Sequence, residues 1–472
     1  MKVLALLLAI YLIEVNGQFS PFRKIFQKLH EEPPPPVPVF RNNINMNYIE
    51  QKLDHFDLNE KRTWQMRYLS NDYYFKPNGP IFIYVGGEWT ISEGSLRGGH
   101  MFDMAKELNG YMFYTEHRYY GRSHPFAELT TANLKYLHVK QALADLAHFI
   151  TTMKSTISGL ENSKVILVGG SYSATMVTWF SRLYPNLVNG AWASSAPLQA
   201  KVDFVEYKEV TGQSIRQVGG DACYIRIENA IKILEEDFAN GDLTNVKKYI
   251  NVCQNFDTNN KLDVWTFFSA ISDIFAGVVQ THNSGSIENM CSLILAGNDD
   301  IAGLGNFLKA YLGYGSQCVD ITYEADVAEL KQTKLSDDMM RQWYYQTCNE
   351  YGWYQTSGSS DQPFGSSFPV ELYTKLCHDV YDMQFSAESI EDNVQQTNID
   401  FGALKPGVNN VYFTHGSLDP WHAMGLLCEG ECGTVIPMYA HCKDLASSSS
   451  ADTEEMSAAK STIFKLVKKW VE

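Results

Sequence analysis

The sequence predicts an α/β protein whose mostly parallel sheet is interrupted by a large helical insertion, and three observations support this. Between about residues 64 and 196, apolar runs of strand length alternate with amphipathic helical segments, the pattern of a parallel sheet covered on both faces. From 198 to 405 strand patterns become sparse and helical periodicity dominates. Strand patterns return near residue 408, so the last part of the chain should complete the sheet.

The beginning of the chain has the order of segments found in secretory signals. Met1-Lys2 is followed by an apolar run from Val3 to Ile13 and by a short stretch ending at Gly17, so residues 1–17 are expected to be a signal peptide. Residues 18–47 include Pro33 to Pro36 and are expected to form a Pro-rich N-terminal extension. Export would place the protein outside the cell or in the lysosome, and no later apolar run predicts a membrane span.

The remaining elements follow from periodicity. Residues 48–197 and 406–472 are expected to form the α/β domain, and residues 198–405 the helical domain. The strands are expected near residues 64–68, 80–85, 111–115, 164–168, 188–196, 408–413 and 434–438, and the clearest helices near 138–152, 175–184, 223–239, 262–279, 335–350 and 463–470.

The charge balance excludes some classes of partner. The chain has 54 acidic residues against 38 lysines and arginines, a net charge of −16. This surplus disfavours binding to nucleic acid or to anionic membrane surfaces. The sequence leaves a homodimer open.

The nine cysteines all lie at or after Cys223. In an exported protein most should form disulfides, and the odd number leaves at least one unpaired. Cys428 and Cys432 are close enough for a local bridge. A zinc site of these two residues with His441 and Cys442 is the less favoured alternative, because export favours oxidation. No metal and no cofactor is expected.

Ser171 is the candidate nucleophile. An apolar run from Lys164 leads to Gly169-Gly-Ser-Tyr-Ser173, and a helical segment follows. This is the layout of a nucleophile elbow, in which a serine occupies a sharp turn between strand and helix. Ser173 replaces the usual last glycine. The alternative is an ordinary turn with a capping serine. A catalytic role for Ser171 therefore requires a base and an acid elsewhere in the chain.

The partners follow in the order that an α/β-hydrolase requires, which is serine, acid, histidine. Asp419 lies a few residues after the expected strand ending near Phe413, and His441 follows the last expected strand. A histidine base oriented by a carboxylate activates a serine hydroxyl. Ser171, Asp419 and His441 are therefore predicted to be catalytic.

Other residues could also fill these roles. Asp419 could cap its own turn, and Asp444 could orient the histidine instead. His415 and His422 could be the base, but both precede the last strand. The oxyanion is expected to bind the backbone N–H groups of Tyr172, which follows the nucleophile, and of Gly87 in a glycine turn.

Taken together, these motifs resemble the serine carboxypeptidase-like family of lysosomal Pro-Xaa carboxypeptidase, dipeptidyl peptidase II and thymus-specific serine protease. The resemblance runs from about Gln51 to the C-terminus. At Gly86-Gly87-Glu88 and at His441-Cys442 the sequence is more similar to the thymus-specific branch than to the Pro-Xaa carboxypeptidase branch. Trp89 stands where the family often has glycine. The matching motifs are Gln51-x-Leu-Asp54-His55-Phe56, Glu116-His117-Arg118-Tyr119-Tyr120-Gly121-x-Ser123, Gln141-Ala-Leu-x-Asp145, Gly169-Gly-Ser-Tyr172, Ser194-Ser-Ala-Pro197, Gly416-x-Leu-Asp-Pro-Trp421 and Ala440-His-Cys-x-Asp444.

The resemblance implies an α/β-hydrolase fold with a large helical, disulfide-containing cap. It also implies a serine peptidase acting on peptides after proline, as a carboxypeptidase or a dipeptidyl peptidase; no motif distinguishes the two. Trp421 and the Trp343-Tyr-Tyr345 run are candidates for an aromatic proline pocket. Two alternatives are an esterase or lipase on the same scaffold, and a non-catalytic binding protein with the hydrolase fold.

Overall fold

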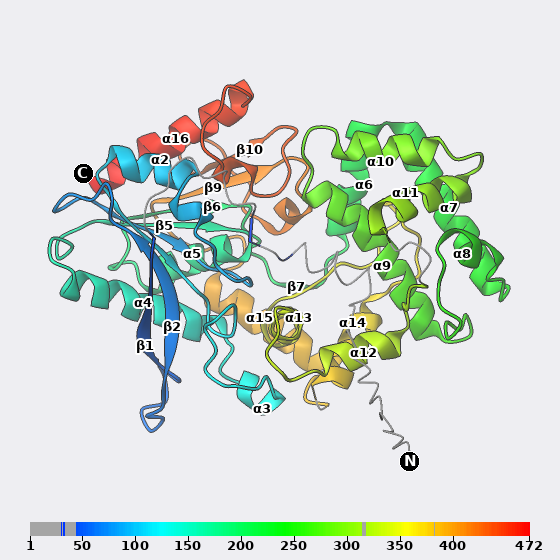
Figure 1. Ribbon diagram of the computed structural model, residues 1–472, viewed down its shortest axis with the longest axis horizontal. Coiled ribbons are helices and arrows are strands. Elements are labelled where there is room, and N and C mark those ends of the chain that lie inside the picture. Colours follow the sequence, from blue (N-terminus) through cyan, green and yellow to red (C-terminus); the bar gives the residue numbers. More distant parts are fainter. Residues whose placement is uncertain (1–29, 31, 34–43, 314–317, 382) are drawn as a thin grey trace, which may run out of the picture.

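Figure 1 shows a computed structural model of the chain, in which the helical region lies beside a twisted sheet with helices on both faces. The structure describes residues 30, 32–33, 44–313, 318–381 and 383–472. The expected signal peptide, 1–17, and most of the expected extension, 18–47, lie outside the described residues.

The sheet has eight strands in the order β1-β2-β4-β3-β5-β6-β9-β10. β1 pairs antiparallel with β2 and β2 with β4, and all other pairs are parallel. This is the predicted α/β-hydrolase arrangement, with β5 at the centre. The strands are β1 (Asn45–Lys52), β2 (Thr63–Asn71), β3 (Ile81–Val85), β4 (Tyr111–Thr115), β5 (Val165–Gly170), β6 (Gly190–Ser194), β9 (Val411–Gly416) and β10 (Gly433–Ile436).

Strand β1 was not predicted and begins within the segment expected to be an extension. It is an edge strand, and only two of its eight residues are buried. Its sequence, NMNYIEQK, therefore carries no strong apolar pattern.

Alternate residues of β5 pack into two separate cores, as the period of a strand requires. Val165 and Leu167 belong to the core under α4 (Val139–Thr156) and α5 (Tyr172–Leu183). Ile166 and Val168 face the core under α2 (His100–Glu107) and α16 (Glu454–Val471). Figure 1 shows α2 and α16 together on one side of the sheet and α4 on the other. Burial of β5 on both faces explains its continuous apolar sequence.

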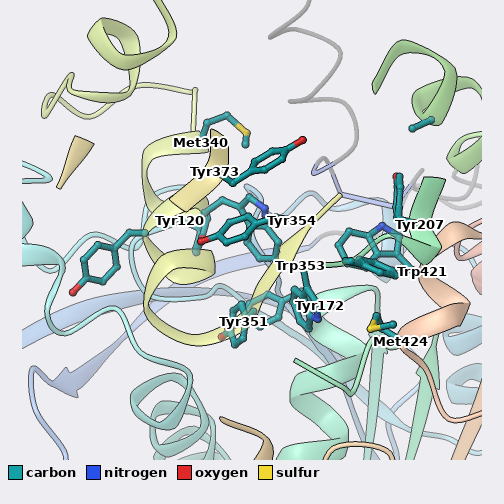
Figure 2. Packing of buried hydrophobic residues seen from close by; sticks show 14 of the residues in the cluster. Tyr120, Tyr172, Tyr207, Met340, Tyr351, Trp353, Tyr354, Tyr373, Trp421 and Met424 are labelled. Atoms are coloured by element: carbon teal, nitrogen blue, oxygen red, sulfur yellow. The ribbon is translucent and has the colours of Figure 1, made fainter. Parts of the chain in front are cut away.

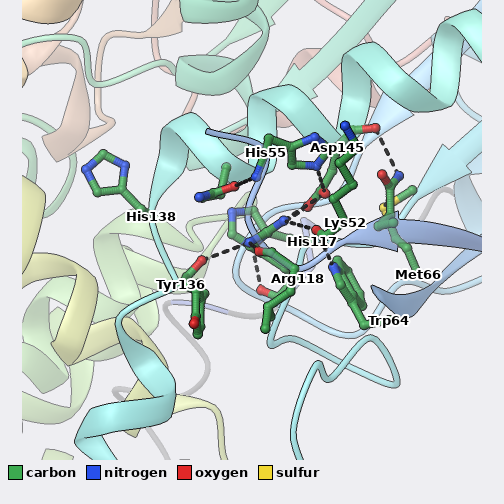
Figure 3. Close-up of polar contacts among 12 residues, drawn as sticks. Lys52, His55, Trp64, Met66, His117, Arg118, Tyr136, His138 and Asp145 are labelled. Carbon is green, nitrogen blue, oxygen red and sulfur yellow. Dashed lines mark hydrogen bonds and ion pairs between the residues drawn. The ribbon is translucent and has the colours of Figure 1, made fainter. Parts of the chain in front are cut away.

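A buried ion-pair cluster fixes the loops at one end of the sheet (Figure 3). Arg118 Nε donates to Asp145 Oδ2 on α4 at 2.7 Å, and Arg118 Nη1 donates to the carbonyls of Leu53 and Tyr136, each at 3.0 Å. His55 Nε2 lies 2.7 Å from Asp145 Oδ1. Burial alone would raise the pKa of Asp145, but the Arg118 charge outweighs it and the pKa is lowered. The buried charges are thus paired, as they must be.

The helical region leaves the sheet after β6 and returns before β9. It contains one short parallel pair, β7 (Lys201–Asp203) with β8 (Gly352–Tyr354). Its helices are α6 (Glu206–Gly219), α7 (Asp221–Ala239), α8 (Thr244–Tyr249), α9 (Lys261–Gln280), α10 (Ser286–Leu295), α11 (Asp300–Leu312), α12 (Tyr323–Leu330), α13 (Met340–Gln346), α14 (Val370–Val380) and α15 (Ala387–Phe401).

Asn398 on α15 ties the two ends of the helical region together. Its amide Oδ1 accepts from the backbone N–H of Ala200 at 3.0 Å, and its Nδ2 donates to the Ala200 carbonyl at 2.8 Å. The chain therefore enters and leaves the helical region at one place.

The helix expected over residues 335–350 differs in the structure. The α-helical part starts only at Met340, after a turn in which Asp338 Oδ1 accepts the Met340 N–H at 3.0 Å. From Thr347 to Tyr351 the chain forms a π-helical turn, which we call η2. Such turns are frequent at functional sites, and in this one the Tyr351 hydroxyl lies 2.8 Å from the Tyr172 hydroxyl.

Helix α9 is the one helix in the described part of the chain that is long and apolar enough to cross a membrane. However, 78% of its most apolar window is buried inside the protein. Its apolar sequence is therefore explained by its place in the core of the helical region.

Three disulfides lie in the helical region: Cys223–Cys291, Cys253–Cys318 and Cys348–Cys377. The local bridge between Cys428 and Cys432 is confirmed, so these two cysteines are not available as zinc ligands. Cys442 is the unpaired cysteine and is buried.

Candidate active site

Ser171 lies at the turn between β5 and α5, in a backbone conformation that non-glycine residues rarely adopt. Its φ is 58° and its ψ is −133°, and such strain is typical of functional sites. A Cβ at Gly169 would lie 2.4 Å from the Ser173 carbonyl oxygen, so only glycine allows strand and helix to approach this closely. The Ser173 hydroxyl donates to the Gly170 carbonyl at 2.9 Å. The turn has the backbone geometry of the nucleophile elbow that the sequence predicts.

Asp419 and His441 are in direct contact. Asp419 follows β9 and is fully buried, and its Oδ2 lies 2.8 Å from His441 Nδ1. Its Oδ1 accepts the Trp421 N–H at 3.0 Å. When Nδ1 donates to Asp419, Nε2 is the nitrogen that can accept a proton. His441 Nε2 has no hydrogen-bond partner among the described residues.

The end of β6 connects the serine and histidine segments. The Ser171 N–H donates to the Ser194 carbonyl at 2.9 Å, and the Cys442 N–H donates to Ser195 Oγ at 3.0 Å. A Cβ at Gly170 would lie 3.2 Å from Cys442 Sγ. The residue before Ser171 therefore packs against the residue after His441.

The charges of the pair stabilise each other. Burial lowers the pKa of His441, but the Asp419 carboxylate and its hydrogen bond reverse this, and the net pKa lies well above the ordinary value. Burial raises the pKa of Asp419, but His441 and a hydrogen bond from Ser195 outweigh it, so the pKa is lowered. Asp419 is therefore an anion that can hold and stabilise an imidazolium.

Asp444 has a different environment from Asp419. Its Oδ1 accepts from Ser194 Oγ at 2.6 Å, and its Oδ2 accepts from Thr414 Oγ1. Burial raises its pKa. The histidine contacts Asp419 and not Asp444, so Asp444 holds the loop after β10 rather than orienting His441.

The other histidines near the site are explained by packing. His415 is buried, which lowers its pKa to about 4, and its ring lies against Gly425. His117 Nδ1 lies 2.7 Å from the Arg118 carbonyl and its Nε2 lies 3.2 Å from the Tyr172 hydroxyl. Both rings therefore support the loops around the site.

The two residues expected to supply oxyanion donors flank the elbow. Tyr172 is the first residue of α5, and Gly87 lies just after β3. A Cβ at Gly87 would lie 2.5 Å from the Trp89 ring. Trp89 is buried and its Nε1 donates to the Tyr114 hydroxyl at 2.8 Å. The tryptophan thus packs against the glycine turn from inside.

An aromatic pocket lies beside the site. Ring contacts run from Tyr172 to Trp343 at 5.6 Å, from Trp343 to Trp353 at 6.2 Å and from Trp353 to Trp421 at 5.6 Å between centroids. This chain of rings joins the neighbour of Ser171 to a residue two positions after Asp419. Figure 2 shows Tyr172, Tyr351 and Trp353 grouped together, with Trp421 against Tyr207. One cavity is lined by His30, Asp273, Trp343, Tyr344, Thr347, Trp353, Tyr354, Gln355, Tyr373 and Trp421.

Of the residues that the sequence proposed for an aromatic pocket, Trp343, Tyr344 and Trp421 line this cavity. Tyr345 does not line it and packs against Tyr381 and Phe385. The sequence did not single out Trp353, which lines the cavity, or Ser195, which contacts the His441 segment.

Trp353 lies in β8, directly after η2, with a φ of 57°. Gly352, the residue before it, was the local signal of a turn. Ser195 also has a positive φ, 57°, at the end of β6. Ser195 follows the end of a parallel strand, as Ser171 and Asp419 do, and this position could have marked it as a residue near the site.

Comparisons with known proteins point to one family. A family model described as serine carboxypeptidase S28 matches residues 51–463. Thymus-specific serine protease of Mus musculus is 30% identical over 446 residues, which cover 90% of this chain and 87% of that protein. The Homo sapiens protein of that name is also 30% identical, over 449 residues, 90% of this chain and 86% of that protein. Lysosomal Pro-X carboxypeptidase of Mus musculus is 27% identical over 494 residues, covering 99% and 97%.

Proposed function

This chain belongs to the serine carboxypeptidase S28 family and is a serine-type peptidase, and from that premise we propose that it is an exported exopeptidase cleaving after proline. The main support for the catalytic mechanism is the hydrogen bond between buried Asp419 and His441. Asp419 follows the carboxyl end of β9, and the strained Ser171 follows the carboxyl end of β5 in the same sheet. The name of the Pro-X carboxypeptidase relative and the aromatic pocket support the proline preference.

The proposed chemistry is acyl transfer. His441 Nε2 takes the proton of Ser171 Oγ as the hydroxyl attacks the scissile carbonyl. The backbone N–H groups of Tyr172 and Gly87 stabilise the oxyanion. His441 then gives its proton to the leaving amine, and water hydrolyses the acyl-enzyme by the same route. Asp419 orients the ring and stabilises the imidazolium throughout.

The proposed substrate contact is a proline ring against indole faces. The pocket contains three tryptophans, of which Trp343 contacts the ring of Tyr172, and Trp421 is two residues from Asp419. A proline side chain is short and apolar, so stacked aromatic walls can bury it with little loss of conformational entropy. The signal-like start of the sequence and the four disulfides support export.

Labelling with a fluorophosphonate probe tests the nucleophile. We expect the purified protein to be labelled at Ser171, Ser171→Ala to lose the label, and Ser155→Ala, at an exposed position on α4, to keep it. Labelling of a folded Ser171→Ala variant at another serine would refute the assignment.

A peptide-library digest read by mass spectrometry tests the substrate. It reports the cleaved bond and the recognised terminus together, so it distinguishes carboxypeptidase from dipeptidyl peptidase action. Cleavage without proline before the scissile bond would contradict the proline preference. Faster turnover of simple acyl esters than of prolyl peptides would favour an esterase.

A further inference from the structure

His30, from the N-terminal extension, lies inside the candidate active site. Its side chain is buried, with 8% of the residue exposed. Its Nδ1 lies 3.3 Å from Glu88 Oε1, and its ring centroid lies 4.8 Å from that of Trp343. Glu88 directly follows Gly87, and Trp343 lies on α13. One extension residue therefore touches both the oxyanion turn and the aromatic pocket.

A second extension residue is anchored two positions further on. Glu32 accepts a hydrogen bond from the Tyr114 hydroxyl at 2.9 Å, and burial raises its pKa. The same hydroxyl accepts the Trp89 N–H at 2.8 Å, so this anchor also lies against the glycine turn. The two anchors thus hold His30 against Glu88 and Trp343, and Glu32 against Tyr114.

The pocket has no room for a proline side chain while His30 is present. The cavity lined by His30, Trp343, Trp353 and Trp421 has a volume of about 20 Å³. This is space for about one water molecule. An imidazole ring takes the place beside Trp343 where the proposed function requires a pyrrolidine ring.

Acidic side chains around the pocket favour an imidazole at the position of His30. Glu88 is nearly fully buried and contacts His30, and its Oε2 has no hydrogen-bond partner among the described residues. Asp273 lines the same cavity, and Lys208 is paired with it at 2.6 Å. An imidazole can donate to the Glu88 carboxylate in its neutral or its charged form.

We propose that the segment carrying His30 and Glu32 is an internal inhibitor of the peptidase, with His30 as the residue that blocks the aromatic pocket. The proposal rests on the proposed function. Because the segment is attached to the chain, its effective concentration at the pocket is on the order of millimolar, so a few contacts are enough to keep the pocket filled. Release of the segment, by displacement or by proteolysis between His30 and β1, opens the site.

This mode of inhibition makes a specific kinetic prediction. Substrate and His30 compete for one pocket, so saturating substrate displaces the segment. The attached inhibitor therefore raises KM without changing kcat. A merely structural role for His30 would instead lower kcat or stability when the side chain is removed.

The test uses the full chain with His30→Ala. We expect KM for a small prolyl substrate to fall at least tenfold with kcat unchanged, and fluorophosphonate labelling of Ser171 to become faster. His378→Ala, on α14, is the matched histidine control and should change neither. Equal KM and labelling rates in wild type and folded His30→Ala would overturn the proposal.

A second measurement covers the case in which His30→Ala does not fold. Glu32→Gln weakens the other anchor and should give a smaller fall in KM. A synthetic peptide of residues 26–36 should inhibit the Glu32→Gln protein competitively, and the same peptide carrying His30→Ala should inhibit at least tenfold less. Equal inhibition by the two peptides, or none by either, would refute the role of His30.

Failure of the two proposals can be told apart. If Ser171 is labelled equally fast in wild type and His30→Ala, the nucleophile stands and the inhibitor is refuted. If neither protein is labelled nor turns over any peptide, the proposed function fails and the inhibitor with it.

Discussion

Asp419 divides its two carboxylate oxygens between the histidine and its own backbone turn. Oδ2 lies 2.8 Å from His441 Nδ1, and Oδ1 accepts the Trp421 N–H at 3.0 Å. The second bond fixes the carboxylate plane, so the ring of His441 can rotate little. The same turn places Trp421 in the aromatic pocket. One short segment therefore sets both the orientation of His441, the proposed base, and part of the pocket wall.

Asp419→Asn should lower kcat by about 10³–10⁴-fold with the fold intact, because the amide favours the wrong tautomer of His441. The control is Asp444→Asn, which keeps the shape of a carboxyl whose pKa burial already raises, and should cost less than tenfold. Steady-state kinetics and thermal unfolding of both variants check this. A larger loss of kcat in Asp444→Asn than in Asp419→Asn would show that Asp444, and not Asp419, orients His441.

The pH dependence of kcat/KM should reflect the Asp419 charge. In the proposed mechanism His441 is the base, which must be neutral to accept a proton, and Asp419 raises its pKa well above the ordinary histidine value. Activity should therefore fall as pH drops through that raised pKa rather than through about 6.5. In Asp419→Asn the raising charge is gone, so the acid limb of the residual activity should move to lower pH. An unchanged limb would show that another group controls it.

Ser195→Ala should lower kcat by about 10–100-fold with a smaller change in KM, as loss of a supporting contact commonly does. Ser195 hydrogen-bonds Asp419 and accepts the Cys442 N–H at 3.0 Å, so it positions both the acid and the histidine segment. Its removal should also raise the pKa of Asp419. If only thermal stability changed while kcat and the pH profile stayed the same, Ser195 would be structural.

Gly169→Ala should destabilise the fold by about 1–3 kcal/mol, the usual range for overpacking. The new Cβ would lie 2.4 Å from the Ser173 carbonyl oxygen. Displacing Ser171 by about 1 Å should cost on the order of 100-fold in kcat/KM. Gly313→Ala, with φ of 59° in open space at the end of α11, should cost about 1 kcal/mol and leave activity unchanged. Equal activity of both variants would contradict the packing argument.

Removing the Cys348–Cys377 disulfide should cost about 3.5 kcal/mol, because it closes a loop with a sequence separation of 29. The Cys348→Ala/Cys377→Ala pair should also raise KM, since Cys348 lies in η2, which leads into Trp353. The Cys428–Cys432 bridge has a separation of only 4 and should contribute about 2 kcal/mol. Denaturant unfolding of the two double variants gives the comparison; equal losses would refute the loop-length argument.

Much of the sheet could be predicted because each buried strand has its own local signal. β5 is apolar at consecutive positions, and β9 ends close to Asp419. The order of serine, acid and histidine along the chain, with strand patterns before each, was enough to propose the site. β1 was not predicted, because its residues are mostly exposed at the sheet edge and so show no apolar pattern.

The pocket could be predicted only in part, because long-range packing builds it. Trp343, Trp353 and Trp421 come from α13, β8 and the loop after β9. The π-helical turn adds a residue to the helix without leaving a trace in apolar periodicity. The contact of His30 with Glu88 joins residues 58 positions apart, which no local pattern encodes.

The two hydrogen bonds between Asn398 and Ala200 suggest that the helical region can be exchanged as a unit. With both bonds on one residue, the two ends of the helical region lie side by side. Further contacts, such as the hydrogen bond from the Tyr120 hydroxyl to Gln346 Oε1, also join this region to the sheet domain. A segment with adjacent ends can be transplanted without moving the ends of the sheet strands. We therefore expect the stretch from Ala200 to Asn398 to be exchangeable with its counterpart in a relative, giving chimeras that keep their hydrolytic centre and inherit the donor's choice of peptide.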